Sequence, residues 1–220
     1  MSIVRTIAEE GLIRYGNYNA DTYVLGPGKR FALWLQGCSA SCPGCVAPEF
    51  SHFEGGRTIS IDLLADKIIN DKGIEGITIS GGEPFLQADK LCVLLEKVKS
   101  VYPEMSVIIY SGYTYEELRA AEDEYITKIL NFYADVLIDG RYIEELNDDK
   151  GLRGSSNQRI IFLTGRYRDN DEFSTIRGRQ GRFITEGNGG RLFMIGVPSK
   201  KTQKLRLMFE KMSKKQIDNK

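Results

Sequence analysis

The sequence has few histidines, tryptophans and cysteines, no excess of charge of either sign and no long apolar run. Its 220 residues include one histidine, one tryptophan and four cysteines. Basic and acidic residues are equal at 30 each, so no excess of charge favours nucleic acid or an anionic membrane as a partner. No apolar run approaches the roughly 20 residues that cross a bilayer. With 41% apolar residues, the composition is ordinary for a soluble globular protein, and we expect no nucleic acid and no membrane partner.

The N-terminus lacks the apolar core of a signal peptide, which predicts a cytoplasmic location. Disulfides are rare in that compartment, and clustered thiols there more often hold metal. The cysteines are therefore treated as candidate ligands.

The length fits one domain, expected over residues 1–198. Residues 200–220 contain eight basic and two acidic side chains. We expect residues 199–220 to form a basic tail that is helical or disordered.

Apolar stretches of strand length alternate with helical patterns along most of the chain. Ser60 is positioned to cap a helix that extends to about Asn70, and Thr114 with Glu117 forms a capping box for a later helix. Such alternation predicts right-handed crossovers and a parallel sheet in an α/β fold. Two short strands or loops are expected within 11–28 and a β-hairpin within 182–195. The expected strands of the sheet are 31–36, 76–80, 107–110, 134–138 and 159–163.

Three cysteines, Cys38, Cys42 and Cys45, lie within eight residues on the loop that leaves the first of these strands. Three thiolates can bind three irons of a [4Fe–4S] cube and leave the fourth iron open to the amine and carboxylate of a substrate. Cys92 lies on the predicted apolar face of a helix, which favours a buried small hydrophobe. A structural zinc site with His52 as fourth ligand is the alternative, although such sites usually draw their ligands from two separate pairs.

Small and polar residues follow the other strands, at the edge where parallel α/β sheets carry their active sites. Gly81 and Gly82 allow a ligand to approach closely, and Glu83, which precedes Pro84, is a candidate partner for an ammonium group. Ser111 is a candidate contact for a ribose. Asp139 is a candidate cofactor or cation ligand, with an ion pair to Arg141 as the alternative. The polar stretch 154–159 fits a turn, or an anion or partner contact.

The chain resembles the radical S-adenosylmethionine (SAM) superfamily. The paired hallmarks are Cys38–Cys45, with the spacing CxxxCxxC, and Gly81–Pro84, with the sequence GGEP. The resemblance is closest to the activating enzymes of glycyl-radical enzymes, in particular the anaerobic ribonucleoside-triphosphate reductase activating protein family. It covers residues 11–198 and rests as well on residues 26–28, 36–38, 110–117, 135–140, 153–159 and 196–198.

The resemblance implies a partial (β/α)6-like barrel with one [4Fe–4S] cluster on the three cysteines and SAM on its open iron. Reductive cleavage of SAM would give a 5′-deoxyadenosyl radical, which takes a hydrogen atom from a glycine of a partner glycyl-radical enzyme. The backbone at Gly44, where many superfamily members have an aromatic residue, would meet the adenine. The cofactor contacts would be completed by Gly81, Gly82, Glu83, Pro84, Ser111 and Asp139. Flavodoxin is the expected electron donor.

Two alternative functions remain open at this point. A radical SAM enzyme could act on a small molecule, as 7-carboxy-7-deazaguanine synthase does, or on a ribosomal peptide. Such an enzyme should show polar recognition groups over a closed mouth. A zinc-stabilised binding module without catalysis is the alternative from another class, and it predicts a colourless protein with one zinc.

Overall fold

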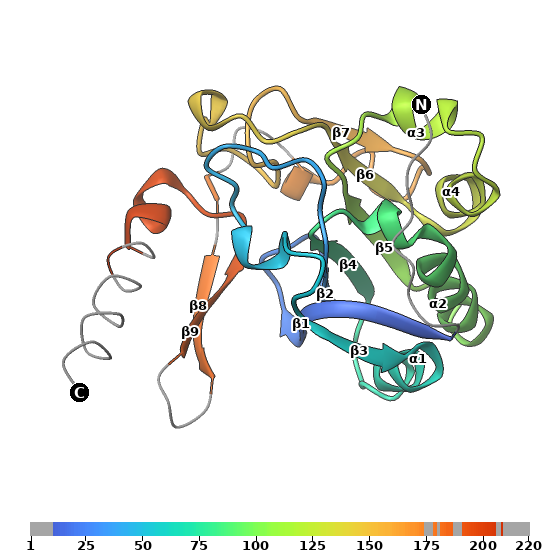
Figure 1. Cartoon of the computed structure of the whole chain (residues 1–220). Coiled ribbons are helices and arrows are strands. Elements are labelled where there is room, and N and C mark those ends of the chain that lie inside the picture. The colour runs from blue at the N-terminus through green and yellow to red at the C-terminus, as the bar shows by residue number, and fades with distance from the viewer. Residues whose placement is uncertain (1–10, 174–177, 180, 187–190, 206–207, 209–220) are drawn as a thin grey trace.

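A mixed seven-stranded sheet forms the centre of the computed structural model, which describes residues 11–173, 178–179, 181–186, 191–205 and 208. The strands lie in the order β3-β1-β2-β4-β5-β6-β7 (Figure 1). Their bounds are β1 Leu12–Thr22, β2 Arg30–Leu35, β3 Arg57–Ser60, β4 Gly76–Gly81, β5 Ser106–Tyr110, β6 Val136–Asp139 and β7 Arg159–Phe162.

Four neighbouring strands, β2, β4, β5 and β6, are parallel, as predicted for the apolar stretches. Helical crossovers on one face join them in turn. The crossover elements are α1 (Ile61–Ile69), α2 (Ala88–Val101), α3 (Tyr115–Ala120), α4 (Glu124–Lys128) and the π-helical turn η3 (Ile129–Tyr133). The carboxyl ends of the four parallel strands therefore meet at one edge of the sheet.

The expectation of a parallel sheet is wrong at both sides of this block. Strand β7 is antiparallel to β6, because the residues between them form only the short 3₁₀ turn η4 (Glu144–Leu146) and not a crossover helix. Strand β1 is one strand of 11 residues rather than two short ones, and it pairs antiparallel with both β2 and β3. Register shifts between Tyr15 and Asn17 and between Asn19 and Thr22 interrupt its pairing, which explains its broken sequence pattern.

The predicted helix starts are confirmed. The Ser60 side chain accepts a hydrogen bond from the Leu63 amide at the start of α1. At α3, the Thr114 hydroxyl accepts from the Glu117 amide while the Glu117 carboxylate accepts from the Thr114 amide. These caps satisfy backbone donors that have no partner within the helix.

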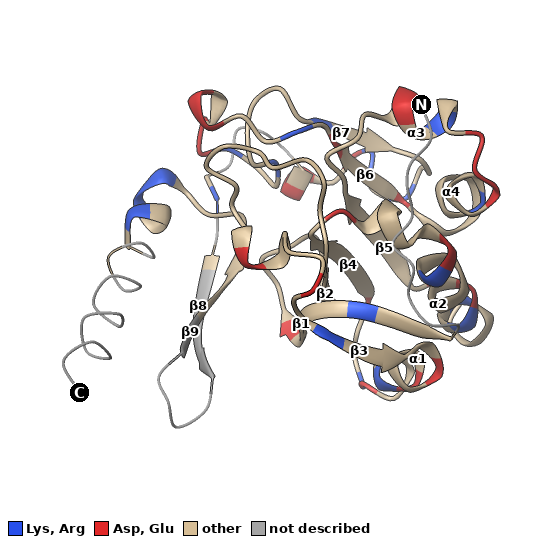
Figure 2. Ribbon diagram, in the orientation of Figure 1, with Lys and Arg blue, Asp and Glu red and all other residues tan. Residues whose placement is uncertain are grey.

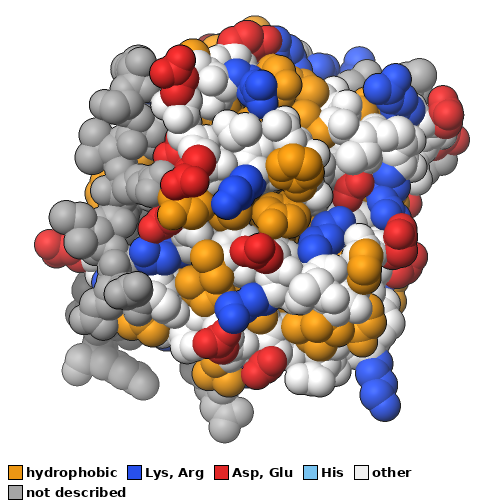
Figure 3. Space-filling model, turned by 90° about the vertical axis from the view of Figure 1, so that its right-hand side faces the viewer, with side chains coloured by type: hydrophobic (Ala, Val, Ile, Leu, Met, Phe, Trp, Pro, Cys, Tyr) orange, Lys and Arg blue, Asp and Glu red, His pale blue; other side chains and the backbone are white. Residues whose placement is uncertain are grey.

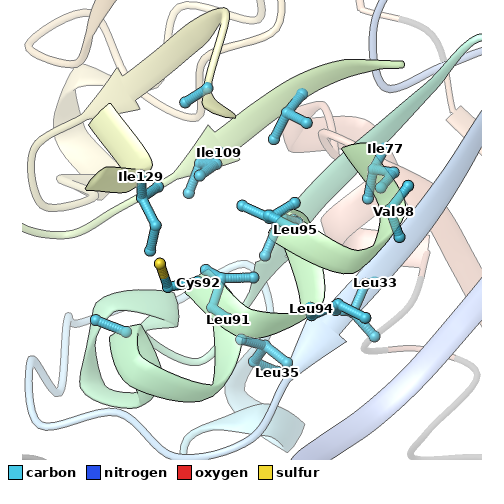
Figure 4. Close-up of a cluster of buried hydrophobic side chains, with 14 of the residues drawn as sticks. Leu33, Leu35, Ile77, Leu91, Cys92, Leu94, Leu95, Val98, Ile109 and Ile129 are labelled. Atoms are coloured by element: carbon cyan, nitrogen blue, oxygen red, sulfur yellow. The ribbon is translucent and has the colours of Figure 1, made fainter. Parts of the chain in front are cut away.

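The main core lies between the sheet and helices α1 and α2. Leu91, Leu94 and Leu95 of α2 are fully buried there, and each stabilises the fold by about 1.5–3 kcal/mol. Cys92 is only 3% exposed, and Figure 4 shows its sulfur pointing toward Ile129 among these side chains. The prediction that Cys92 is a small buried hydrophobe is confirmed.

The opposite face of the sheet is covered by the C-terminal part of the chain. Along β2, Leu33 belongs to the main core whereas Ala32 and Trp34 pack with Ile195 and Val197. Because successive strand residues point to opposite faces, these residues lie on the side away from the helices. The predicted hairpin is present as antiparallel β8 (Gly181–Glu186) and β9 (Arg191–Gly196), on the far side of the sheet from α1 and α2 in Figure 1.

The charged residues of the described part are spread over the surface. Both acidic and basic residues occur along α1 and α2 (Figure 2), and the face that carries the helices mixes hydrophobic, basic and acidic side chains (Figure 3). Residues 200–205 of the predicted basic tail are helical, and positions 206–207 and 209–220 lie outside the described residues. Within the described part, no helix is long and apolar enough to cross a membrane.

Candidate active site

A cavity of about 1530 Å³ opens at the carboxyl ends of the parallel strands. It is lined by residues that follow β2, β4, β5 and β6 and by residues at the end of β9. The predicted site residues on its wall are Cys38, Cys42, Cys45, Gly81, Gly82, Glu83 and Ser111. Residues from separate parts of the sequence therefore share one site at the sheet edge where α/β proteins bind their ligands.

The cysteine loop begins where β2 leaves the sheet. The backbone amides of Gly37 and Cys38 donate to the carbonyl oxygens of Phe50 and Ser51, both at 2.9 Å, and fix the start of the loop. All three cysteines are half-buried free thiols. The Ala40 amide donates to Sγ of Cys38 at 3.4 Å, a type of contact that tunes iron–sulfur clusters. Burial raises the pKa of the Cys38 thiol, so a metal or cluster would have to stabilise its thiolate.

The three thiols lie on one loop and share one wall of the cavity with His52. In the described part of the chain, no three His, Cys, Asp or Glu side chains are grouped to hold one metal ion. A structural zinc site needs four ligands converging on one ion, and exposed His52 does not complete such a group. In a [4Fe–4S] cube each cysteine binds a different iron, so the sulfurs need not converge on one point.

The Gly81–Gly82–Glu83 sequence is held against the start of the cysteine loop. The Gly82 amide donates to the Leu35 carbonyl at 2.7 Å, and the Glu83 amide donates to the Gly37 carbonyl at 2.8 Å. Gly81 has a φ of +104°, and a Cβ atom there would meet the backbone of Leu35. A Cβ atom at Gly82 would meet the Gly37 backbone. Both glycines are therefore required for the close approach of the two motifs.

Glu83 is a buried carboxylate that joins the ends of two strands. Its Oε1 accepts from the Phe85 amide at 3.1 Å and from the Ser111 hydroxyl at 3.0 Å. Its Oε2 accepts from the Gly112 amide at 2.7 Å. Burial outweighs these bonds and raises the pKa of Glu83 from its usual 4.5 to about 7. A carboxylate has roughly four acceptor positions, so Oε2 retains one for a cationic ligand.

Three predicted site residues do not line the cavity. Pro84 is buried at the start of the 3₁₀ turn η2 (Pro84–Gln87). Gly44, with a φ of +67°, faces the side chain of Glu144. Asp139 lies 1% exposed beneath the rim.

The alternative pairing of Asp139 with Arg141 is wrong. Its carboxylate accepts from the Tyr115 amide at 2.7 Å and pairs with Arg159, which also binds Glu116. Because β7 runs antiparallel to β6, Arg159 stands directly opposite Asp139. The antiparallel direction of β7, which the sequence did not predict, therefore determines that Asp139 pairs with Arg159.

Sequence reasoning missed an aromatic group on the cavity wall. Trp34, Phe50 and Phe193 pack together, with the Phe193 ring edge-on to Trp34 at 5.0 Å between centroids. Gln158, within the polar stretch 154–159 named in the sequence analysis, also lines the wall: it accepts from the amides of Gly154 and Ser155 and donates to the Gly140 carbonyl. These bonds confirm the interpretation of residues 154–159 as a turn, and only the three-dimensional fold places Phe193 beside Trp34.

Comparison with known proteins gives consistent matches over the same region. Residues 24–161 match the family model described as a 4Fe-4S single cluster domain. The anaerobic ribonucleoside-triphosphate reductase-activating proteins of Salmonella typhi and Vibrio cholerae serotype O1 are 32% and 34% identical to this chain, each match covering 69% of this chain and 99% of the relative. The crystal structure of QueE from Escherichia coli is a weaker match, with a TM-score of 0.36 and 16% sequence identity. The match covers 48% of this chain and 54% of QueE.

Nearly a third of this chain has no counterpart in these relatives, which are themselves matched along almost their whole length. The family model ends at residue 161, and the residues before position 24 are too few to account for the unmatched part. The hairpin β8–β9 lies beyond the family-model match, and the 69% coverage is less than the expected resemblance over residues 11–198.

Proposed function

Because this chain belongs to the anaerobic ribonucleoside-triphosphate reductase-activating protein family, we propose that it is the radical SAM enzyme that activates an anaerobic ribonucleotide reductase. One observation carries the proposal. The cysteine loop and the Gly81–Gly82–Glu83 sequence, which are far apart along the chain, line one cavity at the carboxyl ends of parallel strands.

Cys38, Cys42 and Cys45 are the proposed ligands of the [4Fe–4S] cluster. Their half-exposed thiols share the cavity wall, and the Ala40 amide already donates to one of the sulfurs. Cys92 is excluded as a fourth ligand because it is buried in the helix-side core. Three protein ligands leave one iron free for a cofactor.

SAM is proposed to bind beside this cluster, where the two groups together supply a 5′-deoxyadenosyl radical. The glycines Gly81 and Gly82 leave space for close contact, and the remaining acceptor position of Glu83 can bind the ammonium group of SAM. Ser111 orients Glu83 through its hydroxyl and lines the same wall. The chain thus binds and orients the cofactor and limits its contact with water.

Gly44 and Asp139 have less direct proposed roles. We propose that the backbone at Gly44 meets the adenine, since Gly44 is exposed and lies between Cys42 and Cys45, which both line the cavity. Asp139 holds Arg159 and the start of α3. We propose that it supports the rim instead of touching the cofactor.

We also propose that the four parallel strands are the core of a partial (β/α)6-like radical SAM barrel. Residues 1–198 would form one domain, because Trp34 of β2 and Ile195 of β9 share a hydrophobic core. An external one-electron donor such as flavodoxin completes the proposed reaction. The partner is the reductase, and its glycine supplies the hydrogen atom.

Anaerobic reconstitution tests this function. The wild-type protein should bind about four irons and four sulfides, release 5′-deoxyadenosine on reduction with SAM, and generate a glycyl radical in its reductase, visible by electron paramagnetic resonance. Cys38→Ala, Cys42→Ala and Cys45→Ala should each lose the cluster spectrum and the product. Cys92→Ala is the matched control and should retain both. A wild-type protein that binds one zinc and releases no 5′-deoxyadenosine would refute the proposal.

A further inference from the structure

One wall of the cavity comes in large part from residues that follow the family-model match. Phe193, Met194, Val197 and Pro198 line the same cavity as Cys38. Tyr110 and Tyr142 continue this surface, and the six residues are called the apolar wall below. Four of the six residues of the apolar wall thus come from beyond the family-model match, whereas Tyr110 and Tyr142 lie within it.

A buried arginine fixes the apolar wall to the neighbouring loop. Arg179 is 1% exposed at its side chain, and its Nη1 donates to the Asn147 side chain at 2.7 Å and to the Pro198 carbonyl at 2.8 Å. Its Nη2 donates to the carbonyl oxygens of Arg153 and Gly154. The guanidinium therefore joins the end of β9 to the turn that contains Gly154, which itself lines the cavity.

Charge balance explains why this arginine can be buried. The carboxylates of Asp148 and Asp149 lie 3.8 and 3.6 Å from the guanidinium. Asp149 also accepts from the Lys200 amide at 2.8 Å, which fastens the segment just beyond the wall. Arg179 has two nearby carboxylates and donates four hydrogen bonds. It therefore fixes the position of Pro198 relative to the loop that contains Asn147 and Gly154.

The accessible part of the apolar wall is the half-buried Tyr110, Phe193 and Met194, whereas Tyr142, Val197 and Pro198 are buried, and the wall has few groups for polar recognition. The Tyr110 hydroxyl donates to the Leu152 carbonyl at 2.7 Å, and the Tyr142 hydroxyl accepts from the Asn147 amide at 3.2 Å. Phe193 packs edge-on against Trp34. Polar and charged groups lie elsewhere around the cavity, namely the thiols and the side chains of Asn17, Gln36, Glu49, His52, Arg57, Glu83, Ser111 and Gln158. A polar small molecule needs directed partners from its pocket, whereas this wall suits an uncharged occupant.

The size of the cavity indicates how large that occupant is. About 1530 Å³ exceeds the roughly 300–1000 Å³ of a pocket for one small molecule. A cofactor and a stretch of polypeptide can therefore occupy the cavity together.

We propose that the apolar wall is a specificity element that receives an uncharged, extended segment of the protein partner, and that Arg179 is its positioning residue. The proposal rests on the proposed function, since the segment would be the part of the reductase that carries the reacting glycine. It assigns a role in substrate selection to the region that contains β9.

The test compares Met194→Glu with Met194→Leu in the reconstituted full-length protein. A glutamate on the wall places a charge where the segment binds, so the KM for the reductase should rise about tenfold or more. The KM for SAM should rise by a smaller factor. Met194→Leu keeps size and polarity and should stay within about twofold of wild type for both. Phe132→Glu, at a 72% exposed position on η3, controls for added charge.

Arg179→Met and Arg179→Lys supply a second measurement that does not depend on the first. Loss of the guanidinium should raise the KM for the reductase more than the KM for SAM, and lysine should restore part of the difference. Iron content and circular dichroism verify that each variant is folded. Equal rises in both KM values, a larger rise for SAM, or no change would overturn the inference. Failure of the wild type to cleave SAM would instead overturn the proposed function.

Discussion

The buried carboxylate of Glu83 should make both stability and SAM binding depend on pH in a way that Glu83→Gln removes. Its pKa is raised by burial from 4.5 to about 7. One pKa unit corresponds to about 1.36 kcal/mol, so the folded protein disfavours the ionised form by about 3 kcal/mol. The group is 2% exposed, which leaves little screening by solvent to reduce this value.

The sign follows from comparing folded and unfolded chains. Between pH 4.5 and 7 the folded protein keeps the proton on Glu83 while the unfolded chain releases it. The stability contributed by this group is thus complete below pH 4.5 and is lost as the pH rises to about 7. The free energy of unfolding should fall by about 1.4 kcal/mol per pH unit between pH 5 and 7 from this group alone. Glu83→Gln does not titrate and should lack that part of the slope.

Anaerobic urea unfolding of both proteins between pH 5 and 8 measures this difference. A parallel measurement of 5′-deoxyadenosine release gives the KM for SAM. That KM should fall as the pH rises toward 7, because the ionised carboxylate binds the ammonium group, and it should be nearly constant in Glu83→Gln. Parallel stability profiles for the two proteins would refute the reasoning about burial. A KM with the same pH dependence in both would refute the proposed contact.

Three further substitutions test the framework that holds the site, each by urea unfolding. Leu94→Ala removes a fully buried side chain from the helix-side core and should cost about 2–5 kcal/mol; a cost below 1 kcal/mol would show that the core refills the space. Thr114→Ala removes the capping bond of α3 and should cost about 1 kcal/mol, whereas Thr114→Ser should restore most of it. Asp139→Ala leaves the Tyr115 amide without its acceptor and Arg159 with only Glu116 as a partner, and should cost about 1–3 kcal/mol; Asp62→Ala, at a side chain that is 74% exposed, is the control.

Much of the fold could be predicted because the capping residues and apolar runs along the chain match the helix starts and buried strands of the structure. The Ser60 cap and the Thr114 capping box were both predicted from spacings along the chain, and the structure has each of them. The apolar runs of β2, β4, β5 and β6 also identified the parallel block. In these elements the short-range pattern alone specifies which face is buried.

The direction of β7 and the ion-pair partner of Asp139 could not be predicted from short-range patterns in the sequence. The direction of β7 depends on whether its connection crosses the sheet, and the loop that precedes it has no strong pattern. The partner of Asp139 follows from that direction, so it was missed together with it. The cysteine loop and Gly81–Glu83 were identified because their chemistry is carried by adjacent residues. The apolar wall depends on contacts between β9 and β2, which are more than 150 residues apart along the chain.

The packing of Phe193 against Trp34 has a practical consequence for experiments. Trp34 is the single tryptophan of the chain, and it lies on the cavity wall, where it is 6% exposed. Fluorescence excited selectively in the indole therefore originates at one known position. Its emission maximum should shift to longer wavelength if the hairpin leaves the sheet, because water then reaches the ring. The chain thus carries a built-in optical reporter of whether its hairpin is in place, readable without any label.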